Sequence, residues 1–273
     1  MITLIRGSGN HSNRLVQAVH FEAYCIENNY KFKNLDFDDM APLYDGCAGQ
    51  KNGFWERLLF VGFKIIRKIQ NKTFFKPFKI YDYDLLARDG KVKPSDGSFV
   101  CGWNFRQNDL VKKYQSFFQE KYKLRKELYE NNSFVEKFFI EKESSVCVGL
   151  HIRRGDYKEW NGGIWYYEKD EYIDIFKRME AFLSAKHSGK KIIFYIFSNE
   201  DVGSWFKNYS NVRISKNEWH IDQFLMSQMD YLAGPPSTFT MWASYIGRAP
   251  LCFIEKADAK FDSESFKVVE AAS

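Results

Sequence analysis

The sequence predicts an α/β protein whose second half is a parallel β-sheet wound as βαβ units. Between residues 146 and 254, short apolar runs alternate with stretches of helical spacing, and this alternation is typical of parallel sheets. The first half begins with a short apolar strand, a glycine-containing loop and a helix, so we expect the same class there. A chain of 273 residues is long enough for two domains of ordinary size.

In the first half, we expect a strand at 2–5 and then a helix capped by Ser12 or Asn13. The later elements are strands at 80–85 and 98–104, and a lysine-rich helix at 110–130 that continues toward residue 140. The polar run 141–145 ends this half. We therefore expect one domain at 1–145 and a second at 146–273.

Residues 54–72 form a basic segment with an apolar stripe. Leu58, Ile65 and Ile69 recur at roughly helical spacing, with lysines and arginines between them. Such a helix can rest on an anionic membrane surface as a peripheral contact. It can equally be an insertion packed on the body of the protein with its basic face in solvent, and this second interpretation is favoured.

In the second half, we expect five strands, at 146–152, 192–197, 212–214, 231–233 and 251–254. The helices between them are expected at 171–185, 200–208, 222–229 and 239–246. The carboxyl ends of parallel strands meet at one edge of the sheet, and ligands of open α/β sheets bind there. The residues that follow these strands are therefore the candidate functional residues.

Composition and cysteine usage restrict the function classes. Hydrophobic residues make up 45% of the chain and charged residues 27%, which is typical of a soluble globular protein. The net charge of +5 mildly favours an anionic ligand, and no nucleic-acid-binding motif is present. The five cysteines lack the C-x-x-C spacing of a metal site, so we expect reduced thiols and a cytoplasmic location. We identify no signal peptide and no apolar stretch long enough to span a membrane.

The strand at 146–152 leads into His151, Arg153, Arg154, Gly155 and Asp156. A guanidinium group can give two parallel charge-assisted hydrogen bonds to phosphate, so paired arginines at a sheet edge are a candidate phosphate clamp. The alternative is a pair of surface ion pairs, each contributing little. Gly155 permits a tight turn, and His151 lies on the same face of the strand as Arg153, so the whole set favours the clamp.

Two other strand ends carry polar residues. Ser198 and Asn199 follow the strand at 192–197, where they either contact a ligand or only cap the next helix. Ser237 and Thr238 open a helix after two prolines, and a helix N-terminus with hydroxyl groups is a natural phosphate site. A helix that is merely capped is the alternative. Together these residues predict a diphosphate held between the arginines and a helix N-terminus.

These motifs resemble those of the α1,2-fucosyltransferases and, more distantly, the α1,6- and protein O-fucosyltransferases. Residues 151–156 match the family's H-x-R-R-x-D motif, and 197–200 resemble F-S-D-D with both acidic positions changed. The third motif is similar to 222–227 followed by 237–243, and the N-terminal G-x-G-N-Q-L-x-Q pattern is loosely met by 7–17. Pro236 and Met241 stand where the family usually has asparagine and tryptophan.

The resemblance implies a GT-B-like glycosyltransferase with two Rossmann-like α/β domains, an N-terminal acceptor-side domain and a C-terminal nucleotide-sugar-binding domain. It implies inverting, metal-independent transfer of L-fucose from GDP-fucose, without a cofactor, to a hydroxyl of a glycan or lipid-linked oligosaccharide. The expected acceptor is a galactoside and the expected linkage α1,2. A transferase that uses another GDP-sugar is one alternative. A sugar-nucleotide-binding protein without catalysis, suggested by the altered second motif, is the other.

The candidate residues fit that chemistry. Negative charge grows on the β-phosphate as the bond to the sugar breaks, and a cation already in place would stabilise it. Arg153 is the first candidate for this role and Arg154 the second, although one of them could support the loop instead. The donor would also contact Ser198, Asn199, Ser237 and Thr238, and Asp222 would bind guanine or cap its own helix.

Inversion also needs a base near the acceptor hydroxyl. Asp156 is the first candidate, and holding the arginines in position is an equally good role for it. His151 is a further catalytic candidate, although a structural or phosphate-facing role suits it better. Other carboxylates near the following loop are Glu159, Glu168 and Asp170. Four tryptophans are candidate sugar platforms, namely Trp55, Trp103, Trp160 and Trp165.

Overall fold

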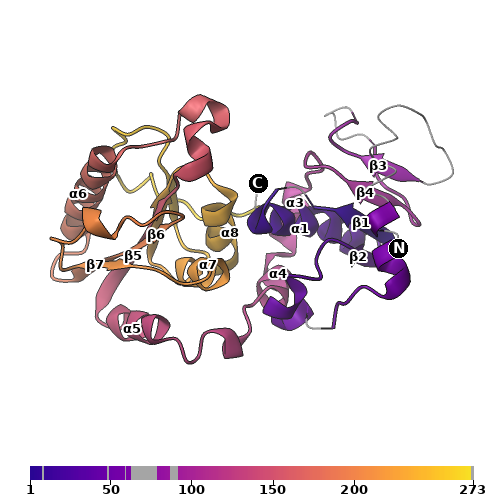
Figure 1. The fold of residues 1–273 in the computed structure, drawn as a ribbon, viewed down its shortest axis with the longest axis horizontal. Coiled ribbons are helices and arrows are strands. Elements are labelled where there is room, and N and C mark those ends of the chain that lie inside the picture. The colour runs from indigo at the N-terminus through magenta and orange to yellow at the C-terminus, as the bar shows by residue number, and fades with distance from the viewer. Residues whose placement is uncertain (8, 48, 59, 63–78, 87–91, 272–273) are drawn as a thin grey trace. The chain divides into compact units, whose positions relative to one another are not determined.

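The computed structural model describes residues 1–7, 9–47, 49–58, 60–62, 79–86 and 92–271. They form two compact units (Figure 1). The first unit comprises Met1–Lys123 with Glu270 and Ala271, and the second comprises Leu124–Val269. Each unit is built on one parallel sheet, so the predicted α/β class is confirmed.

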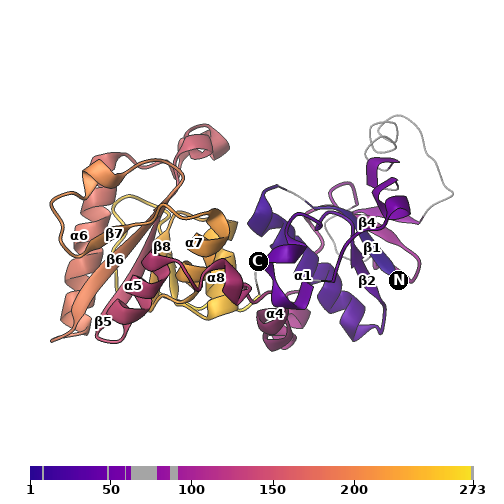
Figure 2. The same ribbon diagram turned by 60° about the horizontal axis from the view of Figure 1, so that its bottom comes forward.

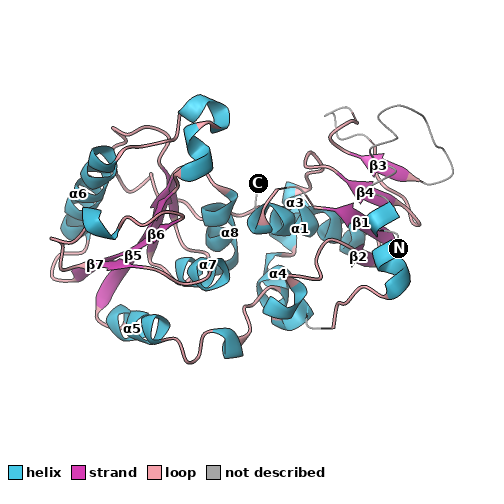
Figure 3. Cartoon of the chain, in the orientation of Figure 1, coloured by secondary structure: helices cyan, strands magenta, loops and turns pink. Residues whose placement is uncertain are grey.

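The sheet of the first unit has the strand order β2-β1-β4-β3 (Figure 3). Its strands are β1 (Ile2–Arg6), β2 (Phe32–Asn34), β3 (Ile80–Asp82) and β4 (Phe99–Cys101). Helix α1 (His11–Glu27) packs Ala18, Phe21 and Cys25 against one face of this sheet. Helices α3 (Asn108–Lys113) and α4 (Gln115–Lys121) follow, with 3₁₀ turns at Ala41–Leu43 and Asp45–Cys47.

Three details of the first half differ from expectation. Helix α1 begins at His11 with Asn10 at the N-cap position, so the predicted caps at Ser12 and Asn13 are wrong. The long helix expected from 110 toward 140 is divided, because the backbone leaves helical geometry at Tyr114 and Tyr122. Strand β2 was not predicted, since its three residues contain a single apolar side chain.

The basic segment expected at 54–72 is described only in part. Residues 54–58 and 60–62 are helical, and Phe60 packs against a small cluster on the sheet's second face that contains Ile5 and Leu35. This contact agrees with a helix packed on the body of the protein. The rest of the predicted segment, at 59 and 63–72, lies outside the described residues. No helix among the described residues is long and apolar enough to cross a membrane.

The sheet of the second unit has the strand order β7-β6-β5-β8-β9. Its strands are β5 (Ser145–Ile152), β6 (Lys191–Ser198), β7 (Val212–Ile214), β8 (Tyr231–Gly234) and β9 (Leu251–Phe253). All five predicted strands are confirmed, and their bounds differ from the predicted ones by one residue at most. The five cysteines of the chain are buried and form no disulfide bond, as predicted.

Helices cover both faces of this second sheet (Figure 2). Helix α6 (Lys169–Lys186) lies on one face, and α5 (Ser133–Lys142), α7 (Trp219–Ser227) and α8 (Thr238–Gly247) lie on the other. Alternate side chains of β5, beginning with Val146, join the core under α6, whereas the side chains between them point to the opposite face. The helix expected at 200–208 is wrong, since only a 3₁₀ turn forms there, at Gly203–Trp205.

The division between the units falls at Lys123 and Leu124, whereas the polar run at 141–145 was expected to mark it. That run is the junction between α5 and β5. Helix α5 belongs to the second unit because its Phe138 packs edge-on against Tyr195 of β6, with 5.2 Å between ring centroids. A short polar run can therefore mark a helix-to-strand turn as well as a linker.

The strand orders single out one point on each sheet. From β1 the chain passes through α1 to β2, and β4 lies on the other side of β1; in the same way, β5 lies between β6 and β8. Open α/β sheets bind ligands beyond the carboxyl ends of the strands at such a switch point. The candidate ligand-binding residues are therefore those that follow β1 and β4 in the first unit, and β5 and β8 in the second.

Candidate functional site

Arg153 and Asp156 lie just beyond the carboxyl end of β5, at the switch point of the second unit. Nη2 of Arg153 is 2.8 Å from one carboxylate oxygen of Asp156 and 2.9 Å from the other. The Arg153 side chain is 25% exposed and that of Asp156 58%. Arg153 thus presents a cation at the sheet edge, paired with a solvent-exposed carboxylate of its own loop.

Arg154 is in different surroundings. Its Nε donates to the Glu200 carboxylate at 3.0 Å, and its Nη1 donates to the Tyr167 carbonyl at 2.8 Å and to Glu168 at 3.2 Å. Its Nη2 donates to the Tyr166 hydroxyl, and only 12% of the side chain is exposed. Arg154 therefore links the start of the β5–α6 loop to its end.

The residues after β6 hold the same loop. The side-chain oxygen of Asn199 accepts from the N–H of Arg154 at 3.0 Å, and the Glu200 carboxylate accepts from the N–H of Gly155 at 3.0 Å. The Ser198 hydroxyl accepts from the N–H of Glu200 at 3.1 Å. Ser198 and Asn199 are thus brought next to Arg154, where they fix backbone.

The N-terminus of α8 lies at the same sheet edge. Strand β8 pairs with β5, and the Tyr157 hydroxyl donates to the Pro236 carbonyl at 2.5 Å. Ser237 is the N-cap of α8, and its hydroxyl accepts from the N–H of Phe239 at 3.2 Å. Ser237 and Thr238 are therefore placed at the strand ends that carry Arg153, as expected.

His151 is buried near the end of β5, with 4% of its surface exposed. Its ring lies 5.4 Å from that of Phe239, and among the described residues its Nδ1 has no hydrogen-bond partner. Burial, with a smaller effect of Arg153, lowers the pKa of His151 to about 3. Its imidazole is therefore neutral at neutral pH, and such a low pKa makes it a weak general base.

Asp222 lies in the first turn of α7. It accepts a hydrogen bond from the hydroxyl of Ser215, the residue that follows β7. Burial raises the pKa of Asp222 to about 7, although hydrogen bonds from Ser215 and Asn217 oppose part of that rise. The N-cap of α7 is Glu218, so the alternative in which Asp222 caps its own helix is wrong.

The other carboxylates near the loop differ in their contacts. Glu168 pairs with Arg154 and forms a capping box with Glu171 at the start of α6. Glu159 and Asp170 are exposed. Among the described residues, no group of three or more His, Cys, Asp or Glu side chains could hold a metal ion.

Three residues that hold the β5–α6 loop were not predicted from the sequence, namely Tyr157, Tyr166 and Glu200. Glu200 was noted in the sequence as one of the changed acidic positions of the second motif. The contact between Glu200 and Arg154 could have been predicted from the strand pairing. Ile152 and Ser198 are paired, and Arg154 and Glu200 lie two residues after them. The hydroxyls of Tyr157 and Tyr166 gave no signal, since their partners depend on the path of the folded loop.

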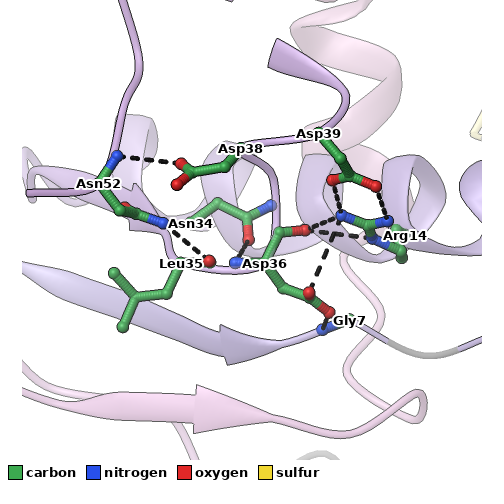
Figure 4. A network of polar contacts seen from close by, with 8 residues as sticks. All are labelled: Gly7, Arg14, Asn34, Leu35, Asp36, Asp38, Asp39 and Asn52. Atoms are coloured by element: carbon green, nitrogen blue, oxygen red, sulfur yellow. Dashed lines mark hydrogen bonds and ion pairs between the residues drawn. The ribbon is translucent and has the colours of Figure 1, made fainter. Parts of the chain in front are cut away.

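The loop after β1 contains a network of another kind (Figure 4). The Arg14 guanidinium donates to both oxygens of Asp39, at 2.8 and 2.6 Å, and also binds the Asp36 carbonyl. The Asp36 carboxylate accepts from the N–H of Gly7 at 2.9 Å. The glycine N–H that could contact a phosphate here is bound by the protein's own carboxylate.

Comparisons with known proteins agree with this architecture. The sequence model of glycosyl transferase family 11 matches residues 59–270. The structure is similar to fucosyltransferase NodZ from Bradyrhizobium, with a TM-score of 0.61 and 12% identity over 97% of this chain and 96% of that one. A NodZ α-1,6-fucosyltransferase soaked with GDP-fucose gives a TM-score of 0.59, with the same identity and coverage. A search of curated proteins finds no match. The structural similarity confirms the predicted GT-B-like fold.

Proposed function

The chain belongs to glycosyl transferase family 11, and we propose from this premise that it transfers L-fucose from GDP-fucose to a hydroxyl of a glycan. The observation that carries the proposal is the position of Arg153 beside the N-terminus of α8, at the switch point of a parallel sheet. NodZ, which shares the fold, has been crystallised with GDP and soaked with GDP-fucose. This supports a GDP-sugar as the donor.

In this proposal the diphosphate of the donor lies between Arg153 and the N-terminus of α8. A guanidinium can bind two phosphate oxygens at once, and the backbone N–H groups of a helix N-terminus favour an anion. Both are in place before the reaction begins. They would stabilise the charge that grows on the leaving phosphate, and this supports transfer that does not depend on a metal ion.

Arg154 is assigned to positioning rather than to the phosphate. Its guanidinium lies 4.4 Å from the ring centre of Tyr166 and 5.3 Å from that of Trp205, and its donors already bind Glu200, Glu168 and the Tyr167 carbonyl. A phosphate would have to displace several of these partners. Ser198 and Asn199 act with Arg154, since they fix the same backbone.

Asp156 is proposed as the base that accepts the proton of the acceptor hydroxyl. A phosphate bound by Arg153 would compete with Asp156 for the same guanidinium and would leave the carboxylate free. In the alternative role, Asp156 only holds Arg153 in position. Asp156→Asn distinguishes the two: loss of a base lowers kcat by about 10²–10⁴-fold with GDP affinity kept, whereas loss of a holding contact weakens GDP binding.

Asp222 is proposed to bind guanine. The base presents N–H donors, and the Asp222 carboxylate contacts Ser215, which follows β7 at the same sheet edge as Arg153. The acceptor is proposed to be a galactoside, glycosylated through an inverting α1,2 transfer, and this rests on the motifs shared with the α1,2-fucosyltransferases. A cytoplasmic location is supported by cysteines that form no disulfide bond, and peripheral membrane contact through 54–72 is a secondary proposal.

Calorimetric titration with GDP, GDP-fucose, GDP-mannose and UDP-galactose in EDTA tests the donor assignment. We expect GDP and GDP-fucose to bind in the micromolar range, GDP-mannose more weakly and UDP-galactose not at all. Absence of binding by every nucleotide would overturn the donor site. Tighter binding of GDP-mannose would favour another GDP-sugar, and binding without transfer to any acceptor in a panel would favour a protein without catalysis.

A further inference from the structure

A row of aromatic rings begins beside Arg153 and continues along the β5–α6 loop. The Arg153 guanidinium lies 5.5 Å from the ring centre of Tyr157. Tyr157 stacks on Trp160 at 5.1 Å and 28°, and Trp160 contacts Trp165 at 5.2 Å and 37°. The three rings are therefore continuous with the proposed donor site.

The outer part of this row is exposed. Tyr157 is buried, but 50% of Trp160 and 56% of Ile164 are accessible to solvent. Exposed apolar side chains that gather beside a functional site usually mark a contact surface. Three polar residues of the same loop are also exposed, namely Asp156, Lys158 and Glu159.

The backbone of the loop is built to bring the two tryptophans together. Asn161, Gly162 and Gly163 follow one another in the left-handed region, with φ of 50°, 70° and 75°. A left-handed non-glycine residue is strained, because its β-carbon crowds the following carbonyl oxygen, and such conformations persist where the surrounding structure requires them. A β-carbon at Gly163 would lie 2.9 Å from the Lys158 carbonyl oxygen, so the turn needs glycine there.

The loop is also held at both ends. Arg154 binds the Tyr167 carbonyl and Glu168 at its end, and the Tyr157 hydroxyl fastens its start to Pro236. The tryptophan side chains therefore project from a loop that is fixed before any ligand binds. A preformed surface of this kind loses little conformational entropy on binding.

We propose that Trp160 and Trp165 form the platform on which the sugar ring of the acceptor, a galactoside, stacks beside Arg153. The C–H face of a pyranose is apolar and slightly positive, and it suits the negative face of an aromatic ring. The polar residues around the platform, Asp156, Lys158 and Glu159, are of the types that bind sugar hydroxyls. The inference rests on the proposed function, because that function places the donor beside Arg153.

Saturation-transfer-difference NMR with lactose tests the platform directly. The aromatic protons of the GDP-loaded protein are saturated, and the transfer to the galactose protons of lactose is measured. We expect a clear signal with the wild-type protein, its loss in Trp160→Ala, and partial retention in Trp160→Phe, which keeps an aromatic face. Trp55→Ala removes an even more exposed tryptophan of the first unit and should keep the full signal.

The possible results separate the platform from the donor site. A lactose signal that persists in Trp160→Ala, or that is absent from the wild-type protein, overturns the platform. Calorimetric titration of GDP into the same samples reports on the donor site alone, so a protein that binds GDP but gives either of these results retains the proposed donor and loses only this inference. Thermal melting of each variant checks that the exposed Trp160 can be replaced without unfolding the protein.

Discussion

The loop after β1 and the loop after β5 occupy equivalent points on two parallel sheets, and each is associated with an arginine that contacts an aspartate. In the first unit, both terminal nitrogens of Arg14 bind Asp39, and the side chain is 12% exposed. In the second unit, Arg153 contacts Asp156 through a single nitrogen and is 25% exposed. Arg14 therefore stabilises the fold, whereas Arg153 can exchange its aspartate partner for a phosphate.

The N–H groups at the two points differ in the same way. The N–H of Gly7 is bound by the Asp36 carboxylate, whereas the N-terminus of α8 is capped by the neutral hydroxyl of Ser237. The strand order places a candidate site in both units, but the neighbouring side chains determine whether an anion can enter. The diphosphate of the donor is therefore assigned to the second unit.

Removing the two arginines separately should have the largest and most contrasting effects. Arg153→Ala should lower kcat/KM for transfer from GDP-fucose by at least about 10²-fold, as expected when a preorganised group that stabilises transition-state charge is lost. Its melting temperature should stay close to that of the wild-type protein, since the side chain is partly exposed. Kinetics of transfer and thermal melting measure the two properties.

Arg14→Ala is the matched control. It removes a 12% exposed side chain that binds the Asp36 carbonyl and the 59% exposed Asp39 carboxylate. The free energy of unfolding should therefore fall by about 1–3 kcal/mol, while kcat/KM below the melting temperature changes little. If the two variants exchanged these properties, the assignment of the phosphate to the second unit would be wrong.

Arg154→Ala should behave as a stability variant rather than as a second Arg153→Ala. Because the Tyr167 carbonyl and the exposed Glu200 and Glu168 would lose a largely buried partner, the free energy of unfolding should fall by about 1–3 kcal/mol, as chemical denaturation can measure. Binding of GDP should change far less than in Arg153→Ala. Equal loss of GDP affinity in both variants, with stability unchanged, would restore the two-arginine clamp.

Asp222 should make both stability and GDP binding depend on pH. The pKa of Asp222 rises from its ordinary value of 3.8 to about 7 in the folded protein. At pH values between these two, the unfolded chain has lost a proton that the folded protein retains. The free energy of unfolding should therefore fall as pH rises across this range and level off above it. Asp222→Asn should remove this component, which denaturation at several pH values can show.

Binding of GDP should respond in the opposite direction, because the ionised carboxylate is the better acceptor for guanine N–H groups. Affinity in the wild-type protein should rise as pH passes about 7, and at higher pH Asp222→Asn should bind about tenfold more weakly. Titration of the GDP phosphate affects both proteins equally, so it cancels in the ratio of their GDP affinities. A ratio that does not vary with pH would exclude Asp222 from the guanine site.

The smallest effect is expected from Gly7→Ala in the first unit. A β-carbon there would lie 2.5 Å from Cγ of Arg14, so the Arg14 network must shift, at a cost of about 1–3 kcal/mol. Denaturation measures the loss, and GDP binding should be unaffected. Weaker GDP binding in this variant would show that the loop after β1 also contacts the donor.

The sequence predicted the second unit well because its buried parallel strands are uninterrupted apolar runs. The apolar run at 192–197, for example, matches β6 to within one residue at each end. The first unit was predicted less completely, since β2 is short and the expected long helix breaks at Tyr114 and Tyr122. Nothing local marks these breaks, because α3 and α4 are separated by a single residue.

At the site, adjacency in the sequence identified Arg153 and Arg154 but could not separate them. Their difference depends on Glu200, Tyr166 and Trp205, which the fold brings from other parts of the chain. The pKa of Asp222 likewise depends on burial that no local pattern shows. Motif spacing therefore predicts where a site lies, and tertiary partners determine what each residue does there.

The most direct test of the central claim is calorimetric titration of GDP into Arg153→Ala, with the wild-type protein and Arg14→Ala measured under the same conditions. The structure predicts that GDP affinity falls by about 10–100-fold in Arg153→Ala, as expected for the loss of a charge-assisted contact, and is unchanged in Arg14→Ala. Unchanged affinity in Arg153→Ala, or its loss in Arg14→Ala alone, would contradict the account.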